Sequence, residues 1–164
     1  MYILNEEEQE ALLRDMSLVD TSDEGCTKTY LHAETGDTWT LYYPYAAMHG
    51  GGPRYLRRGP IPDRMDEWVW ACLISGQEDN VVGAATDLVS QPEKWDVVLD
   101  TLEAKQNNVT SDLIRLFIEK LGILNPINRY PVVGKRFEEV AADGAHFRAL
   151  ARRSAALINH LSKR

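Results

Sequence analysis

The chain lacks the features of secreted, disulfide-bonded and membrane-spanning proteins. Its 164 residues include only two cysteines, Cys26 in a polar stretch and Cys72 within an apolar run. This distribution is typical of a reduced chain with one buried thiol. Nowhere do about eighteen apolar residues follow one another, and residues 1–6 carry neither the positive charge nor the apolar stretch of a signal peptide. These absences predict a cytoplasmic protein that does not span a membrane.

Recognisable catalytic and metal-binding motifs are also missing. The glycines at 50–52 are not followed by the Lys-Ser/Thr pair of a phosphate-binding loop, and they lack the spacing of a dinucleotide fingerprint. No serine elbow or cysteine nucleophile signature occurs. The histidines show no metal-binding spacing; they are His32, His49, His146 and His160. We expect no catalytic residue, metal or cofactor, and a small enzyme is the less favoured alternative because catalytic residues can be distant in sequence.

Basic residues are scarce at the start of the chain. The first 27 residues contain eight acidic residues and one base, Arg14, whereas the last thirty contain seven bases and three acids. The net charge of −7 opposes direct binding to nucleic acids, which are recognised by basic surfaces. The asymmetry favours a positively charged partner, and the alternative is that the charge only keeps a small domain soluble.

The N-terminal part has signals for one helix and one hairpin. Asn5, with Glu8 three residues later, predicts a capped helix of about ten residues, whose apolar side is Leu12, Leu13 and Met16. Residues 28–33 and 38–43 are rich in β-branched and aromatic residues, with a turn at 34–37 between them. They predict a β-hairpin, which must pack on helices or gain a further strand because an isolated hairpin is marginally stable.

The remainder is expected to be an irregular crossover followed by helices. Residues 44–62 are rich in glycine and proline, which disfavour regular structure, although a loop of this length is often functional. Capping residues and apolar spacing then predict helices at 63–75, 78–89, 92–102, 110–121 and 135–142, and a last one from 143. We expect a single α+β domain over 1–164, predominantly α. It comprises an N-terminal helix, hairpin and loop (1–62) and a bundle or short solenoid of about five to six helices (63–164).

A family resemblance rests on the hairpin and loop. They contain Gly36-Asp37-Thr38-Trp39, Tyr42-Tyr43-Pro44 and His49-Gly50-Gly51-Gly52-Pro53. Small, acidic and without catalytic motifs, the chain resembles the immunity proteins that bacteria encode beside polymorphic or contact-dependent growth-inhibition toxins, mainly over residues 1–62. The resemblance implies a cytoplasmic protein that binds and blocks one cognate toxin, and many of those toxins are basic nucleases.

Acidic and aromatic side chains would form the contact surface under this interpretation. Carboxylates can mimic phosphates and steer a basic toxin, while aromatic side chains contribute binding energy. The candidate partner-binding residues are Glu6, Glu7, Glu10, Asp20, Asp23, Glu24, Tyr42, Tyr43, Tyr45, His49 and Tyr55. A departure from this picture is a cluster of arginines that would repel a basic toxin, namely Arg54, Arg57, Arg58 and Arg64. The alternative function is a helical scaffold that binds another protein through residues 66–122.

Overall fold

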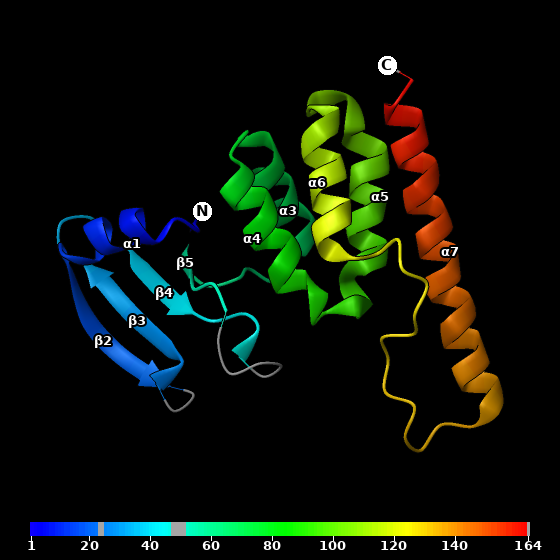
Figure 1. The fold of residues 1–164 in the computed structure, drawn as a ribbon, viewed down its shortest axis with the longest axis horizontal. Helices are drawn as coiled ribbons and strands as arrows, with labels where there is room; N and C mark the ends of the chain where they lie inside the picture. The colour runs from blue at the N-terminus through cyan, green and yellow to red at the C-terminus, as the bar shows by residue number, and fades with distance from the viewer. Residues whose placement is uncertain (23–24, 47–51, 164) are drawn as a thin grey trace.

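The N-terminal part of the chain folds as a five-stranded antiparallel sheet. The computed structural model describes residues 1–22, 25–46 and 52–163 (Figure 1). Its strands lie in the order β1-β5-β4-β3-β2, so that β1 and β2 form the two edges. Their bounds are β1 (Tyr2–Ile3), β2 (Met16–Ser22), β3 (Thr27–His32), β4 (Thr38–Tyr42) and β5 (Tyr55–Arg58).

The prediction that the N-terminal part consists of one helix and a single hairpin is therefore wrong, because the helix, Glu6–Leu13, is present but accompanies a five-stranded sheet. The expected hairpin is present as β3 and β4, but it forms the middle of a larger sheet. Met16, assigned to the first helix, begins β2, which is almost entirely exposed and so lacks the apolar alternation of a half-buried strand. The prediction of an irregular loop over residues 44–62 is also wrong at residues 55–58, which form β5. The glycines and prolines on either side of this short strand had indicated a loop.

Helix α1 (Glu6–Leu13) covers one face of the sheet. The side-chain oxygen of Asn5 accepts hydrogen bonds from the backbone amides of Glu7 and Glu8 at 2.9 and 3.1 Å. This cap begins the helix as its sequence predicts. Leu12 and Leu13 then pack against a small apolar cluster on the sheet, formed by Trp39, Leu41 and Leu56. The acidic first turn of α1 is consequently held over the sheet while its side chains remain in solvent.

The helices of the C-terminal part stand side by side, with α4 nearest the sheet and α7 farthest from it (Figure 1). Their bounds are α3 (Met65–Ile74), α4 (Glu78–Val89), α5 (Trp95–Lys105), α6 (Ser111–Leu121) and α7 (Phe137–Leu161), with 3-10 turns η2 (Pro92–Lys94) and η3 (Gln106–Asn108). A continuous apolar core joins them, and its largest fully buried side chains include Trp95, Phe117 and Phe147. None of the described helices is long and apolar enough to cross a membrane.

Helix α7 is one continuous helix of 25 residues. The prediction of a short helix at 135–142 followed by a second from 143 is wrong, because Gly144 lies within the helix without interrupting it. A lone glycine weakens a helix by about 1 kcal/mol. The burial of Phe147, Leu150 and Leu157 on the same helix offsets this cost.

The two cysteines differ in accessibility, which gives a first testable expectation. Cys26 is exposed, whereas Cys72 is buried on α3 and burial raises the pKa of its thiol to about 11. Because the thiolate is the reactive form, an aromatic disulfide reagent at about pH 8 should label one thiol per chain rapidly and the second only in denaturant. The absorbance of the released thiolate measures both phases, and Cys26→Ser should remove the fast one. Rapid labelling of two thiols in the native protein would contradict the burial of Cys72.

Candidate partner-binding site

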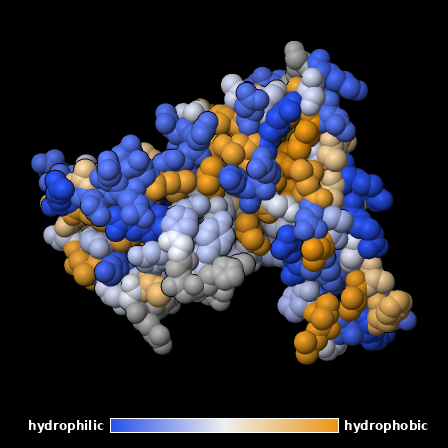
Figure 2. Space-filling model, in the orientation of Figure 1, coloured by the Kyte–Doolittle hydropathy of each residue, from blue (hydrophilic) through white to orange (hydrophobic). Residues whose placement is uncertain are grey.

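The acidic residues of α1 are mostly free of internal partners. Glu6, Glu7, Glu8 and Glu10 are all exposed, and hydrophilic side chains cover this part of the surface (Figure 2). Glu10 accepts a hydrogen bond from Arg54 at 2.9 Å. The carboxylates of the other three form no ion pair with any residue that the structure describes. They lie in the first turn, where negative charge stabilises a helix, and they remain available to an external cation.

Acidic side chains continue from α1 to the edge of the sheet. Asp15 lies in the turn between α1 and β2, and Asp20 lies on β2; both are exposed. Neither pairs with a base among the residues present in the described ranges. The other acidic candidates of this segment, Asp23 and Glu24, lie outside the described residues, as does His49. We define the acidic surface as Glu6, Glu7, Glu8 and Asp15. Asp20 extends the negative charge along the sheet edge from the opposite face, because it lies opposite Thr29, whose neighbour Tyr30 packs on the α1 side.

Each of the four arginines that would repel a basic partner is paired with a carboxylate of the chain itself. Arg54 contacts Glu10 at 2.9 Å, Arg57 contacts Asp87 at 2.7 Å and Arg58 contacts Asp37 at 2.7 Å. Arg64 contacts Glu67 at 2.8 Å. The arginine cluster is therefore largely compensated within the molecule, and the departure noted in the sequence does not produce an unopposed basic patch.

The tyrosine candidates Tyr42 and Tyr55 lie on the other face of the sheet from α1. Leu41, which precedes Tyr42, and Leu56, which follows Tyr55, both pack on the α1 side. Side chains alternate between the two faces of a strand. The two tyrosines therefore point toward α4. Tyr42 donates to Asp87 at 2.5 Å, and the hydroxyl of Tyr55, which is 5% exposed, lies 3.5 Å from that of Thr86. The structure does not bring these tyrosines and the acidic surface together on one face.

Asp87 of α4 is the centre of the contact between sheet and helices. Its carboxylate accepts from the hydroxyl of Tyr2 at 2.6 Å, from Tyr42, and from the guanidinium of Arg57 at 2.7 Å. Burial raises the pKa of both tyrosines, and the neighbouring Asp87 carboxylate raises it further. Burial alone would lower the pKa of Arg57, but the same carboxylate outweighs it and the pKa is raised. The tyrosines and Arg57 therefore stay protonated, as expected of a satisfied structural network.

Sequence reasoning missed this network. Asp87 belongs to no recognisable sequence motif. The sequence indicates its burial only through its position among the small and apolar residues of α4, such as Ala84, Ala85 and Leu88. A carboxylate in that setting needs partners when it is buried. Those partners come from β1, β4 and β5, which lie far away in the sequence. Only the folded arrangement identifies them.

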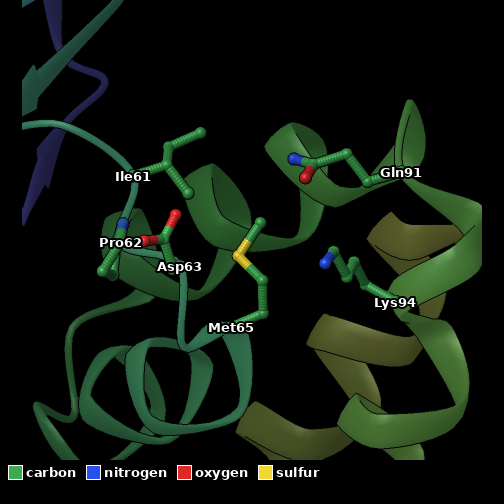
Figure 3. Close-up of a pocket in the computed structure, with 6 residues that line it drawn as sticks. All are labelled: Ile61, Pro62, Asp63, Met65, Gln91 and Lys94. Atoms are coloured by element: carbon green, nitrogen blue, oxygen red, sulfur yellow. The ribbon is translucent and has the colours of Figure 1, made fainter.

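Tyr43 and Tyr45 border an open hollow between the sheet and the helices. Its volume is about 490 Å³, and its wall also includes Pro44, Ile61, Val89 and Gln91. A smaller hollow of about 270 Å³ shares Ile61 and Gln91 with it. Figure 3 shows Ile61 and Met65 on one side of this smaller hollow, facing Gln91 and Lys94 on the other. The tyrosine candidates Tyr43 and Tyr45 thus belong to a groove separate from the acidic surface.

A cation site is not apparent in the same region. Within the ranges that the structure describes, no group of three or more histidine, cysteine or acidic residues is placed to hold a metal ion. The acidic side chains of α1 project from successive positions of an exposed helix. Their arrangement suits a broad electrostatic contact with another macromolecule.

Residues 5–58 match the Immunity protein 27 family. The matched segment begins at the cap of α1 and ends with β5, so it contains the acidic surface and four strands of the sheet. This match confirms the resemblance to immunity proteins that the sequence suggested. Helices α3 to α7 lie outside it. No curated protein and no solved structure matches the chain.

Proposed function

We propose that this protein is an immunity protein that binds a cognate bacterial toxin in the cytoplasm and blocks it by covering its active site or target surface. The observation that carries this proposal is the match of residues 5–58 to Immunity protein 27. An inhibitor of this kind acts by occupying a surface and needs no chemistry of its own. The toxin bound in this way would carry a basic surface, as a nuclease domain does.

Electrostatics supports the acidic surface as the first point of contact. Glu6, Glu7 and Glu8 are exposed and without internal ion pairs among the described residues, and Asp15 and Asp20 extend the negative charge along the sheet edge. Complementary potentials raise association rates and fix the orientation of the partner. Tyr43 and Tyr45 remain part of the proposal as a second contact, through the groove that they border.

The direct test uses the toxin encoded beside this gene. Co-expression with that toxin should restore the growth that the toxin alone prevents, and the two purified proteins should form a stoichiometric complex measurable by calorimetry. A neighbouring gene product that is toxic but neither binds this chain nor is neutralised by it would overturn the proposal.

Neutralising the first turn of α1 should slow binding. In the triple variant Glu6→Gln, Glu7→Gln, Glu8→Gln, the association rate with the toxin is expected to fall about 10- to 100-fold at low ionic strength, because steering depends on local charge. The dissociation rate should change much less. Biolayer interferometry at two salt concentrations measures both rates, and the difference between variant and parent should shrink as salt rises.

A matched variant separates local charge from net charge. Asp112→Asn, Glu119→Gln and Glu138→Gln remove three exposed carboxylates from α6 and α7, without an ion pair to any described residue. This control changes the net charge by the same amount as the α1 variant. It should leave the association rate within about twofold of the parent. An equal decrease in both variants would show that α1 is not the contact surface.

A further inference from the structure

The two edges of the sheet, β1 and β2, differ in their contacts with the rest of the fold. At the β1 edge, α4 supplies acceptors for the strand: the amide of Tyr2 donates to Asn80 at 2.6 Å and that of Leu4 donates to Asp79 at 2.7 Å. At the other edge, β2 pairs with β3 and with no other strand of the described residues, and it lies on the side of the sheet away from α3 to α7 (Figure 1). Within the described ranges, the fold therefore covers the β1 edge and leaves the β2 edge without a second partner strand.

The direction of the amides on β3 follows from a single hydrogen bond. The amide of His32 donates to the carbonyl of Asp37, which immediately precedes β4, at 2.9 Å. Backbone groups alternate in direction along a strand. His32 therefore directs its backbone groups toward β4, whereas Leu31 and Thr29 direct theirs toward β2.

The register transfers this alternation to β2. Leu31 lies opposite Ser17 and Thr29 lies opposite Asp20, so the backbone groups of these two β2 residues face β3. The register shifts between Leu18 and Asp20, and this β-bulge contains Val19 as the extra residue. Leu18 and Thr21 consequently direct their amides and carbonyls outward, away from the sheet.

Little on β2 protects this open edge. Natural edge strands are usually blocked by proline, by lysine or by very short length, whereas β2 has seven residues and contains neither proline nor lysine. The bulge and Asp20 are its only protective features. Leu18 and Val19 are each 54% exposed, so the edge offers apolar contacts as well as unpaired backbone groups.

We propose that the open edge of β2 accepts an extended, basic segment of the cognate toxin as a sixth strand. This inference rests on the proposed function and specifies its binding mode. Strand addition obtains affinity from main-chain hydrogen bonds and specificity from flanking side chains. Here the flanking side chains are Asp15, in the turn before β2, and Asp20 on β2, which select lysine and arginine on the incoming strand.

The same charges oppose pairing with a second copy of this chain. Two β2 strands placed edge to edge would bring Asp15 and Asp20 of both copies close together. Like charges at such an interface are destabilising. A basic partner removes this repulsion, which is why the toxin and not a second protomer is the expected occupant.

Amide hydrogen exchange tests the inference directly. The isotopically labelled protein is followed by NMR alone and in complex with the toxin encoded beside its gene, after calorimetry has established binding. The amides of Leu18 and Thr21 should exchange rapidly in the free protein and at least about tenfold more slowly in the complex, as expected when an open amide gains a hydrogen bond. Binding without protection of these two amides would overturn the strand addition and leave the proposed function intact. Absence of binding would overturn both.

A pair of substitutions at one position separates backbone from side chain. Thr21→Pro removes the outward amide and is compatible with an edge strand whose amide faces solvent, whereas Thr21→Val keeps the amide. The proline variant should bind the toxin about tenfold more weakly, the equivalent of one hydrogen bond, and the valine variant should bind like the parent. Equal effects of the two would contradict the proposal. Circular dichroism checks folding, and if the proline variant fails to fold, the exchange measurement on the parent protein still decides.

Protection that already exists in the free protein and rises with its concentration would also overturn the inference. That result would assign the edge to self-association. Sedimentation of the free protein over the same concentration range measures this directly.

Discussion

Gly83→Ala is expected to lower the free energy of unfolding by about 3 kcal/mol, in the upper range for overpacking a buried site. A Cβ atom at position 83 would overlap Cγ and Cδ1 of the Tyr2 ring, and this ring is buried. Rotation of the ring about its own axis does not relieve the clash, because Cγ lies on that axis, and a larger movement would break the hydrogen bond from the hydroxyl to Asp87. The substitution therefore forces β1 away from α4 and weakens the contact between the sheet and the helices.

Gly144→Ala provides the matched control. Gly144 also lies within a helix, but the atom nearest to its added Cβ is the guanidinium end of Arg148 at 3.2 Å, which can move away. Alanine favours a helix over glycine by about 1 kcal/mol, so this variant should be slightly more stable than the parent. Urea unfolding of both variants, followed by tryptophan fluorescence, measures the difference. A Gly83→Ala protein as stable as Gly144→Ala would show that the contact between α4 and Tyr2 is looser than described.

Asp87→Asn should destabilise the protein by about 3 to 5 kcal/mol, the range measured when one member of a buried ion pair is removed. The side chains of Asp87 and Arg57 are only 6% and 14% exposed, so the guanidinium would be left buried without its counter-charge. The hydroxyls of Tyr2 and Tyr42 would also lose a charged acceptor. Asp100→Asn is the control, because Asp100 pairs with Arg153 but is 65% exposed, and an exposed pair contributes at most about 1 kcal/mol.

A double-mutant cycle distinguishes the ion pair from general damage to the site. Arg57→Met should lessen the cost of Asp87→Asn, because the double variant no longer contains an uncompensated buried cation. The combined loss should therefore be smaller than the sum of the two single losses by at least about 1 kcal/mol. Strictly additive losses would mean that Arg57 and Asp87 act independently.

The helical part was the more predictable half of the fold. The helices between 65 and 121 are local structures whose apolar spacing is visible in the sequence, and Gly76, Pro92 and Gly122 mark where they end or begin. The sheet was harder to predict because strand pairing is not local. β1 and β5 are very short, and β2 shows no alternation because nearly all of it faces solvent.

The candidate site also has a part that could be predicted from the sequence and a part that could not. Exposed acids at the start of a capped helix can be recognised in a sequence, because the cap and the charges are neighbours. The role of Tyr42 and Tyr55 could not be recognised, because an aromatic strand residue reads the same whether it faces solvent or a helix. Which face each tyrosine occupies depends on the register of β4 against β5 and on the position of α4. The openness of β2 likewise becomes visible only when the order of the strands is known.

The carboxylate of Asp87 limits how the segment that matches Immunity protein 27 could be transplanted. Residues 5–58 alone would carry Tyr42, Tyr55 and Arg57 without the α4 surface that covers them, and without the amide acceptors Asn80 and Asp79 that close β1. A graft onto another scaffold should therefore begin at Met1 and extend through α4. Designs cut at the end of the sheet would expose its inner face and invite aggregation.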